Sequence, residues 1–293
     1  MKLSPRKFMG GGGDGGKGGD IVLKVSPHLY DLSKFKGNKK FIARDEEKGR
    51  ETNKKGKDAE DLIVYVPQGT RIIDIENNEE IVDLASDGQE FLLCHGGRGC
   101  RGNYKRGYTV GPGEPEEKTV LLDYRIPNEV AILGLPNSGK TSLFNLLTGK
   151  NYKVADYPFT TASCVWGEAK LGFKSFVLLD TPPFKKTKET RQVAENIFLR
   201  HIFRSKILLF LSENRSYDDD FSVIKDEISQ LEPSLLKGKK IFYLLTKVDK
   251  IEESIPKTKG IIPISVQKNI GIEELKKKIV NYLDKGSPVL KNS

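Results

Sequence analysis

Glycine is distributed very unevenly along this chain of 293 residues. Twenty of the 29 glycines lie in residues 1–126 and nine in residues 127–293. Two runs stand out, GGGGDGGKGG at 10–19 and GGRGCRG at 96–102. Glycine allows close chain approach and positive φ values that other residues resist, so the two parts must be built differently. We therefore predict two domains, residues 1–126 and residues 127–293.

The glycine runs alternate with segments that have the pattern of β-strands. Apolar and β-branched residues predict strands at 21–25, 62–66, 70–75 and 90–93, and a last strand within 103–127. Runs of glycine are often flexible linkers. Because these runs are wedged between strands, we expect tightly packed irregular backbone instead. The first domain is therefore predicted to be all-β.

Charge and composition narrow the class of protein. Residues 1–126 carry 22 basic and 21 acidic side chains, whereas residues 127–293 carry 27 and 19, so the net charge of +9 lies almost wholly in the second part. This excess favours a polyanionic partner such as RNA.

Apolar runs such as 207–211 are too short to cross a bilayer, which takes about 20 residues. Three cysteines without metal-ligand spacing fit a reducing compartment. We expect a monomer without a membrane partner in the cytoplasm, or alternatively in an organelle matrix.

From residue 128 the pattern changes to alternating strands and helices. Strands are predicted at the ranges 129–135, 175–180, 206–212, 239–246 and 261–266, and helices at 140–147, 189–203, 221–236 and 272–283. This alternation predicts an α/β domain with a mainly parallel sheet covered on both faces.

The strongest motif is GLPNSGKT at residues 134–141, which satisfies G-x-x-x-x-G-K-[ST] between a predicted strand and a predicted helix. Glycines let backbone N–H groups turn inward around phosphates, and the helix N-terminus adds partial positive charge. Lys140 is predicted to neutralise the β- and γ-phosphates, and Thr141 to offer its hydroxyl to Mg²⁺. This segment is therefore predicted to be a nucleotide-binding P-loop.

Further motifs follow in the order that a guanine-nucleotide switch requires. Asp180 ends a strand and can hold Mg²⁺ through water. The segment 156–161, DYPFTT, offers a threonine to close over the metal and γ-phosphate. In TKVD, residues 246–249, the Asp249 carboxylate can accept two hydrogen bonds from guanine that adenine cannot offer, and Lys247 can lie across the base. Ser265 and Val266 supply a turn near the base edge. GTP is therefore preferred over ATP.

These motifs together resemble the Obg family of GTPases over nearly the whole chain. The first half matches through GGGGDGGKGGDIVLKV, GKDAEDLIVYVPQGT and GGRGCRGN, and the second through GLPNSGKTSL, DYPFTT, LLDTP, FLRHI and TKVD. The resemblance implies a slow GTPase that requires Mg²⁺ and associates with the large ribosomal subunit or its RNA during assembly. It also implies a first domain built as an eight-stranded barrel with projecting glycine-rich left-handed helices.

The resemblance assigns roles to individual positions. It favours Thr161 over Thr160 as the metal-sensing threonine, links Asn137 to K⁺, and places the hydrophobic Phe184 where other GTPases carry a catalytic glutamine. Lys140, Thr161 and Asp180 are expected to act in hydrolysis, and Thr141, Thr161 and Asp180 to hold Mg²⁺. The expected binding set for GTP and GDP is Gly134, Pro136, Asn137, Ser138, Gly139, Lys140, Thr141, Ser142, Thr246, Lys247, Asp249, Ser265 and Val266.

One departure from the family pattern affects the predicted activity. The family reads Asp-x-Pro-Gly, whereas this chain reads DTPP at 180–183. Proline has no N–H to donate to the γ-phosphate and has a fixed φ. Two hypotheses therefore remain open: a GTPase that switches with its nucleotide, and a scaffold that binds guanine nucleotide and the ribosome or RNA without efficient hydrolysis. Two further departures are milder than the one at Pro183: Thr246 stands where the family has Asn, and Val266 stands where it has Ala.

Overall fold

The protein divides into two compact units, Met1–Tyr124 and Arg125–Ser293. The boundary lies two residues before the predicted one. The structure is a computed structural model, and it describes residues 13–37, 39–45, 54–102, 111–155, 164–184, 198–213, 217–251 and 260–286. The expectations for segment 156–161, including Thr161, therefore lie outside the described residues.

The described part of the first unit contains six strands in two sheets. Strands β1 (Ile21–Ser26), β2 (Leu62–Pro67) and β5 (Glu90–Cys94) form one sheet in the order β2-β1-β5, in which β1 and β2 are parallel. Strands β3 (Thr70–Asp74), β4 (Glu79–Leu84) and β6 (Val120–Tyr124) form the other, in the order β4-β3-β6.

The inner faces of these sheets build a small core from Leu23, Val25, Val64, Val66, Ile72 and Leu84. Sequence patterning predicted five of the strands and missed β4. The eight-stranded barrel and the left-handed helices remain expectations from the resemblance.

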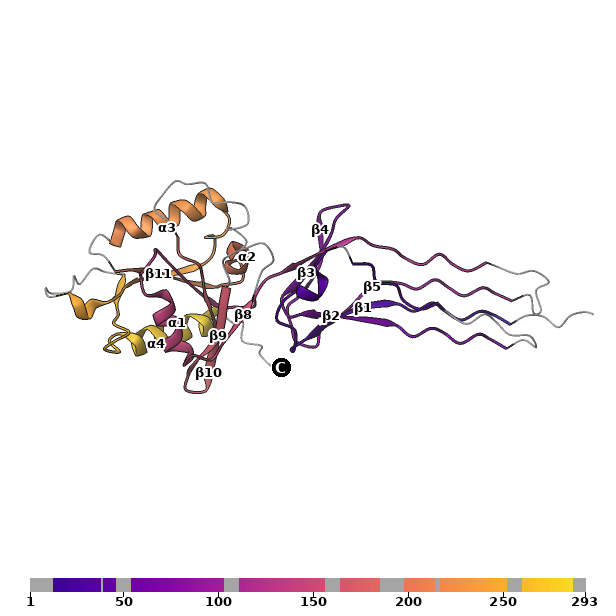
Figure 1. The fold of residues 1–293 in the computed structure, drawn as a ribbon, viewed down its shortest axis with the longest axis horizontal. Coiled ribbons are helices and arrows are strands. Elements are labelled where there is room, and N and C mark those ends of the chain that lie inside the picture. The colour runs from indigo at the N-terminus through magenta and orange to yellow at the C-terminus, as the bar shows by residue number, and fades with distance from the viewer. Residues whose placement is uncertain are drawn as a thin grey trace, which may run out of the picture. The chain divides into compact units, whose positions relative to one another are not determined.

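The described parts of the glycine runs, residues 13–19 and 96–102, lie in extended segments that pack side by side (Figure 1). Backbone bonds join them, such as Gly15 N–H to the Cys100 carbonyl at 2.7 Å and Gly18 N–H to the Gly97 carbonyl at 2.9 Å. A Cβ added at Gly99 would lie 2.0 Å from the Gly16 carbonyl oxygen, and one at Gly96 would lie 2.1 Å from that of Gly18. The expected tight packing is confirmed, and its cause at these positions is close approach of backbones.

The second unit is an α/β domain around a seven-stranded sheet in the order β13-β12-β11-β7-β10-β9-β8. The strands are β7 (Val130–Gly134), β8 (Tyr152–Ala155), β9 (Cys164–Leu171), β10 (Lys174–Asp180), β11 (Ile207–Ser212), β12 (Lys240–Leu245) and β13 (Ile261–Pro263). Four neighbouring pairs are parallel, and β8, β9 and β10 are joined by antiparallel pairing. The predicted mainly parallel sheet is confirmed, and β8 and β9 were missed.

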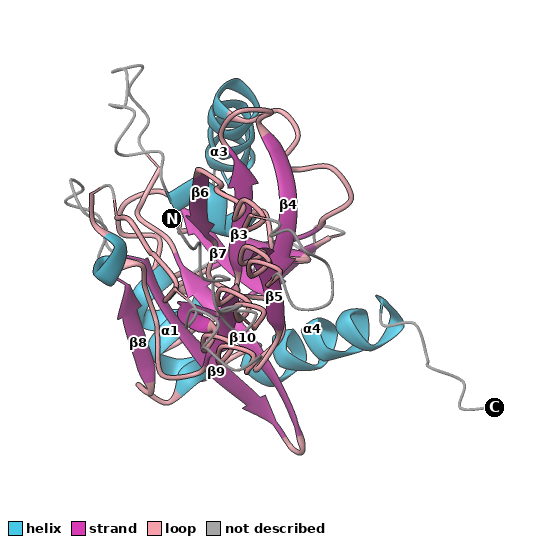
Figure 2. Cartoon of the chain, turned by 90° about the vertical axis from the view of Figure 1, so that its right-hand side faces the viewer, coloured by secondary structure: helices cyan, strands magenta, loops and turns pink. Residues whose placement is uncertain are grey.

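Helices cover both faces of this sheet, with α1 and α4 on one side and α3 on the other (Figures 1 and 2). They are α1 (Lys140–Thr148), α2 (Leu199–Ile202), α3 (Tyr217–Leu231) and α4 (Ile272–Gly286). Apolar side chains of α1 and α4, including Phe144 and Leu275, join the main core with the fully buried strands β7 and β11. Because parallel strands here share a direction, their carboxyl ends and the following loops meet at one edge, where ligands of such sheets bind.

The boundaries of α3 differ from the prediction at both ends. The predicted helix 221–236 begins earlier, at Tyr217, and ends at Leu231. Pro233 disfavours helical backbone in the residue before it, which accounts for the early end. The acidic residues Asp218–Asp220 form the first turn, where carboxylates complement the positive helix end.

Candidate functional site

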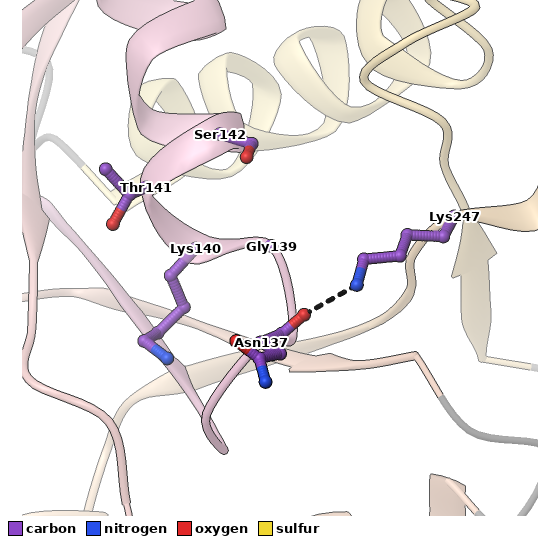
Figure 3. A pocket seen from close by; sticks show the side chains of 6 residues that line it. All are labelled: Asn137, Gly139, Lys140, Thr141, Ser142 and Lys247. Atoms are coloured by element: carbon purple, nitrogen blue, oxygen red, sulfur yellow. Dashed lines mark hydrogen bonds between the residues drawn. The ribbon is translucent and has the colours of Figure 1, made fainter.

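The loop between β7 and α1 borders an open cavity of about 410 Å³ at the carboxyl edge of the sheet. Its lining comprises Asn137, Gly139, Lys140, Thr141, Ser142 and Lys247 (Figure 3). The loop turns through two residues with left-handed backbone, Asn137 at φ 63° and Gly139 at φ 88°. At Gly134 a Cβ would lie 2.4 Å from the Ser138 hydroxyl and 2.9 Å from the Leu211 carbonyl oxygen, so only glycine fits.

The helix that follows begins at the cavity. Because the first N–H groups of a helix have no partner within it, the amides of Lys140, Thr141 and Ser142 are available to an anion there. The Ser138 hydroxyl is buried and has no hydrogen-bond partner within the described part of the chain. The geometry of this loop therefore fits a phosphate group.

The ammonium group of Lys140 is a buried positive charge next to this loop. Its side chain is 6% exposed, and its Nζ donates to the carbonyl oxygens of Gly134 at 3.1 Å and Leu135 at 2.9 Å. Burial lowers the pKa of Lys140 to about 8, an effect partly opposed by the negative charge of Asp180. The ammonium lacks a carboxylate hydrogen-bond partner among the described residues, so a phosphate would complete its environment.

Thr141 and Asp180 meet beside this lysine. The Thr141 hydroxyl Oγ1 donates to Asp180 Oδ2 at 2.8 Å, which joins the first turn of α1 to the end of β10. Asp180 is buried, and its Oδ1 has no hydrogen-bond partner in the described residues. Desolvation raises the pKa of this carboxyl, opposed by the Thr141 bond and the Lys140 charge.

This pair fits Mg²⁺. The ion prefers hydroxyl, carboxylate and phosphate oxygens, and it is commonly held by one or two protein carboxylates while the substrate and water complete its shell. An unpartnered buried carboxylate oxygen next to a hydroxyl meets that requirement. Within the described residues, no group of three or more His, Cys, Asp or Glu side chains could hold a metal by itself. A metal here would depend on oxygens that the nucleotide supplies.

The predicted base-binding residues lie at the same edge, after β12 and β13. Asp249 Oδ1 accepts a hydrogen bond from the buried Ser265 hydroxyl at 2.5 Å, and Ser265 Oγ also accepts the Lys268 N–H at 3.1 Å. The Ser265 bond lowers the pKa of Asp249, so the carboxylate stays ionised. Val266 is partly buried against the main core. Asp249 is thus oriented as an acceptor, and Ser265 acts through its side chain as well as its turn.

Thr246 and Lys247 connect this base motif to the phosphate loop. The Thr246 hydroxyl lies 3.0 Å from the Ser138 carbonyl oxygen and 3.2 Å from that of Ser212, and it is buried. Lys247, which has left-handed backbone at φ 56°, donates from Nζ to the Asn137 carbonyl at 2.8 Å (Figure 3). These contacts hold the start of the predicted base-binding motif against the predicted phosphate-binding loop.

The segment after Asp180 returns to the phosphate loop. Thr181 donates its hydroxyl to the Ile132 carbonyl at 2.7 Å, and Phe184 N–H donates to the Gly134 carbonyl at 3.1 Å. The Phe184 ring is fully buried and packs edge-on against Phe198 with ring centroids 5.8 Å apart. Phe184 is therefore directed into the core, and Pro183 next to it is exposed.

One charged neighbour of the site was missed by sequence reasoning. Glu213 follows β11 directly and its carboxylate pairs with the Lys247 ammonium. The available signal was its position at the carboxyl end of a predicted parallel strand, which places it at the same edge as Asp180 and Asp249. Six of the thirteen predicted binding residues line the cavity, and the other seven do not: Gly134, Pro136, Ser138, Thr246, Asp249, Ser265 and Val266.

Comparisons with known proteins match both units. Residues 5–112 match the family model described as GTP1/OBG, and residues 129–247 match the one described as 50S ribosome-binding GTPase. A GTPase Obg of Prosthecochloris aestuarii is 33% identical over 293 residues, covering 94% of this chain and 89% of that protein. A GTPase Obg of Sulfurihydrogenibium sp. is 38% identical over 256 residues, covering 83% and 74%.

A solved structure is similar to part of the chain. The G domain of the T. maritima FeoB iron transporter is 28% identical, with a TM-score of 0.42, and the match covers 53% of this chain and 98% of that chain. Among the described residues, no helix is both long enough and apolar enough to span a membrane.

Proposed function

The chain belongs to the Obg family of GTPases, and on this premise we propose that it binds GTP and GDP with Mg²⁺ and hydrolyses GTP slowly. The observation that carries the proposal is the convergence of three groups at one sheet edge. They are the Lys140 ammonium, the Thr141–Asp180 pair and the Asp249 carboxylate. Together they provide a phosphate charge partner, a metal site and a base acceptor.

Each group has a defined task. The loop amides and Lys140 position the β- and γ-phosphates, while Thr141 and Asp180 would hold Mg²⁺. When bound, the ion neutralises charge that develops on the phosphate oxygens during transfer. Asp249 accepts two hydrogen bonds from guanine that adenine cannot offer, so the site should select against adenine. Catalysis rests on positioning and electrostatics, with Thr161 proposed to complete the metal shell and Asn137 to take part in K⁺ activation.

We further propose that the protein acts in assembly of the large ribosomal subunit, as a monomer in the cytoplasm or an organelle matrix. Three features support this role: the family descriptions and names above, the tightly packed glycine-rich segments, and the +8 charge of residues 127–293 against +1 in residues 1–126. The glycine-rich segments are proposed to be left-handed helices that project from a barrel and contact ribosomal RNA.

A second candidate is a scaffold that binds guanine nucleotide and the ribosome without efficient hydrolysis. The observation that favours it is Pro183, which follows the metal-binding strand and has no N–H to offer the γ-phosphate. Such a protein would keep nucleotide affinity but lose the difference between its GTP and GDP states. A loop that cannot sense the γ-phosphate cannot shift populations between two conformations.

Single-turnover hydrolysis of GTP with Mg²⁺ and K⁺, with and without large ribosomal subunits, separates these candidates. We expect slow hydrolysis that the subunits accelerate, and co-sedimentation with them that differs between a non-hydrolysable GTP analogue and GDP. Tight binding without hydrolysis in either condition would favour the scaffold. Absence of guanine-nucleotide binding would contradict both.

A further inference from the structure

Glu213 lies at the carboxyl edge of the sheet, beside Lys247, which lines the cavity. It is the first residue after β11, and β11 pairs in parallel with β12, with Ser212 opposite Leu245. Lys247 follows β12 by two residues, so both side chains leave the same edge. The Glu213 carboxylate is paired with the Lys247 ammonium, and the two side chains are about one-third exposed, at 31% and 38%.

Lys247 is thereby fixed by two acceptors from different parts of the fold. One is the Glu213 carboxylate after β11, and the other is the Asn137 carbonyl in the phosphate loop, 2.8 Å from Nζ. A free lysine side chain has about 2 kcal/mol of rotamer entropy to lose on ordering. In this structure the two acceptors hold the Lys247 side chain in one orientation, and the left-handed backbone of Lys247 sets the direction in which that side chain leaves the main chain.

The ion pair between Glu213 and Lys247 also changes the charge that a ligand meets beside Lys247. Lys247 and Lys140 both line the cavity, and an unpaired Lys247 ammonium would compete with Lys140 for phosphate oxygens. Because Glu213 pairs with its ammonium group, Lys247 can place the hydrocarbon part of its side chain against the flat face of a purine ring. Asp249, held by Ser265, lies on the same edge as the acceptor for that ring.

From this geometry we infer that Glu213 is a positioning residue, which holds Lys247 across the plane of the bound purine. The inference rests on the proposed function, because it deepens the assignment of this site to guanine nucleotides. Glu213 contributes to ring binding through Lys247, without a contact to the phosphates. Loss of the Glu213 carboxylate should therefore weaken the binding of GTP and GDP equally, and it should leave the hydrolysis rate of bound GTP unchanged.

The test measures the dissociation constants of GTP and GDP for the full chain and for Glu213→Gln. We expect both to rise by the same factor, about threefold to fivefold, which is the upper part of the range for a partly exposed ion pair. The difference from wild type should shrink at high salt, because a pair this exposed is screened. Glu274→Gln, which removes an exposed pair with Lys278 on α4, is the matched control and should leave both constants unchanged.

A double-mutant cycle excludes a merely structural effect. In a Lys247→Met background, Glu213→Gln should change affinity by less than about 1.5-fold, since its partner is gone. Equal losses in both backgrounds, unequal losses for GTP and GDP, or wild-type affinity of Glu213→Gln would each overturn the inference. Wild-type protein that binds no guanine nucleotide would instead refute the proposed function.

Discussion

The Thr141 hydroxyl and the Asp180 carboxylate are joined across 2.8 Å, although 39 positions separate them in the sequence. The bond fixes the first turn of α1 to the end of β10, next to the Lys140 ammonium. It satisfies one carboxylate oxygen and leaves the other buried without a partner among the described residues. An arrangement that costs desolvation energy and leaves an acceptor open is typical of a ligand site.

Asp180→Asn should separate metal binding from stability. We expect the gain in GTP affinity that Mg²⁺ provides to fall by on the order of 10-fold to 100-fold, because the amide is a poor metal ligand. The nucleotide-free protein should melt higher at pH 7. Folding raises the pKa of Asp180 through burial, so the charged form opposes folding above the unfolded pKa, and a neutral amide removes that cost.

The measurements are GTP titrations with Mg²⁺ and with EDTA, and thermal melts without nucleotide. Asp284→Asn, on the exposed end of α4, is a control that should retain the Mg²⁺ effect. An unchanged Mg²⁺ effect in Asp180→Asn would contradict the assigned metal site.

Lys140 should make nucleotide affinity depend on pH. Its pKa in the free protein is about 8, because burial disfavours the charged form. Phosphate binds the ammonium, so affinity should be nearly constant below pH 8 and fall above it, by up to about tenfold per pH unit. Isothermal titration between pH 7 and 9 measures this. The Lys140→Met variant should bind nucleotide weakly at every pH, and its affinity should fall less steeply above pH 8 than that of wild type. Equal pH dependence of nucleotide affinity in the two proteins would contradict the prediction.

Pro183→Gly and Pro183→Ala should both raise the single-turnover rate of GTP hydrolysis. Either residue restores a backbone N–H beside the γ-phosphate, and a hydrogen bond to a charged group contributes about 1.5–3 kcal/mol, or roughly tenfold or more in rate. Comparing the two variants helps to separate the N–H from backbone freedom, since both restore the N–H and glycine adds more backbone freedom than alanine. Rates equal to that of wild type in both variants would show that Pro183 does not limit activity.

Gly99→Ala should disrupt the packed glycine-rich segments of the first unit. Its Cβ would lie 2.0 Å from the Gly16 carbonyl oxygen and 2.4 Å from that of Gly15, so backbones must separate. We expect a loss of about 1–3 kcal/mol in the stability of this unit. Gly111→Ala is the matched control, because its Cβ meets nothing within 4 Å and its φ is not positive. Hydrogen exchange of residues 13–20 and 95–102 measures both, and equal protection in the two variants would contradict the prediction.

Local sequence rules predicted most of the second unit and its site. The P-loop motif, the strand-end position of Asp180 and the TKVD segment each have a local signature, and the parallel topology brings them together. The antiparallel β9–β10 hairpin was missed although Gly172, in left-handed conformation, marks its turn. Apolar and polar residues alternate on both sides of that glycine, and this pattern could have predicted the hairpin.

Other features depend on tertiary contacts that no local pattern encodes. The Glu213–Lys247 pair forms only because β11 and β12 are neighbours, and the Asn137–Lys247 bond spans 110 positions. Asp220 is buried in α3 and accepts a hydrogen bond from Ser212 at 2.6 Å, although it lies in a run of three acidic residues. A run of three acidic residues suggests exposure, whereas helix periodicity turns one of them inward.

The most direct test of the site is the nucleotide preference of wild-type protein and Asp249→Asn, measured as dissociation constants for GTP, XTP and ATP. Wild type should prefer GTP over both others. Asp249→Asn should lose on the order of 100-fold in GTP affinity and gain affinity for XTP, because an amide can donate to the oxygen that xanthine presents. Unchanged GTP affinity in Asp249→Asn, or equal binding of GTP and ATP by wild type, would contradict the assignment of this cavity to guanine nucleotides.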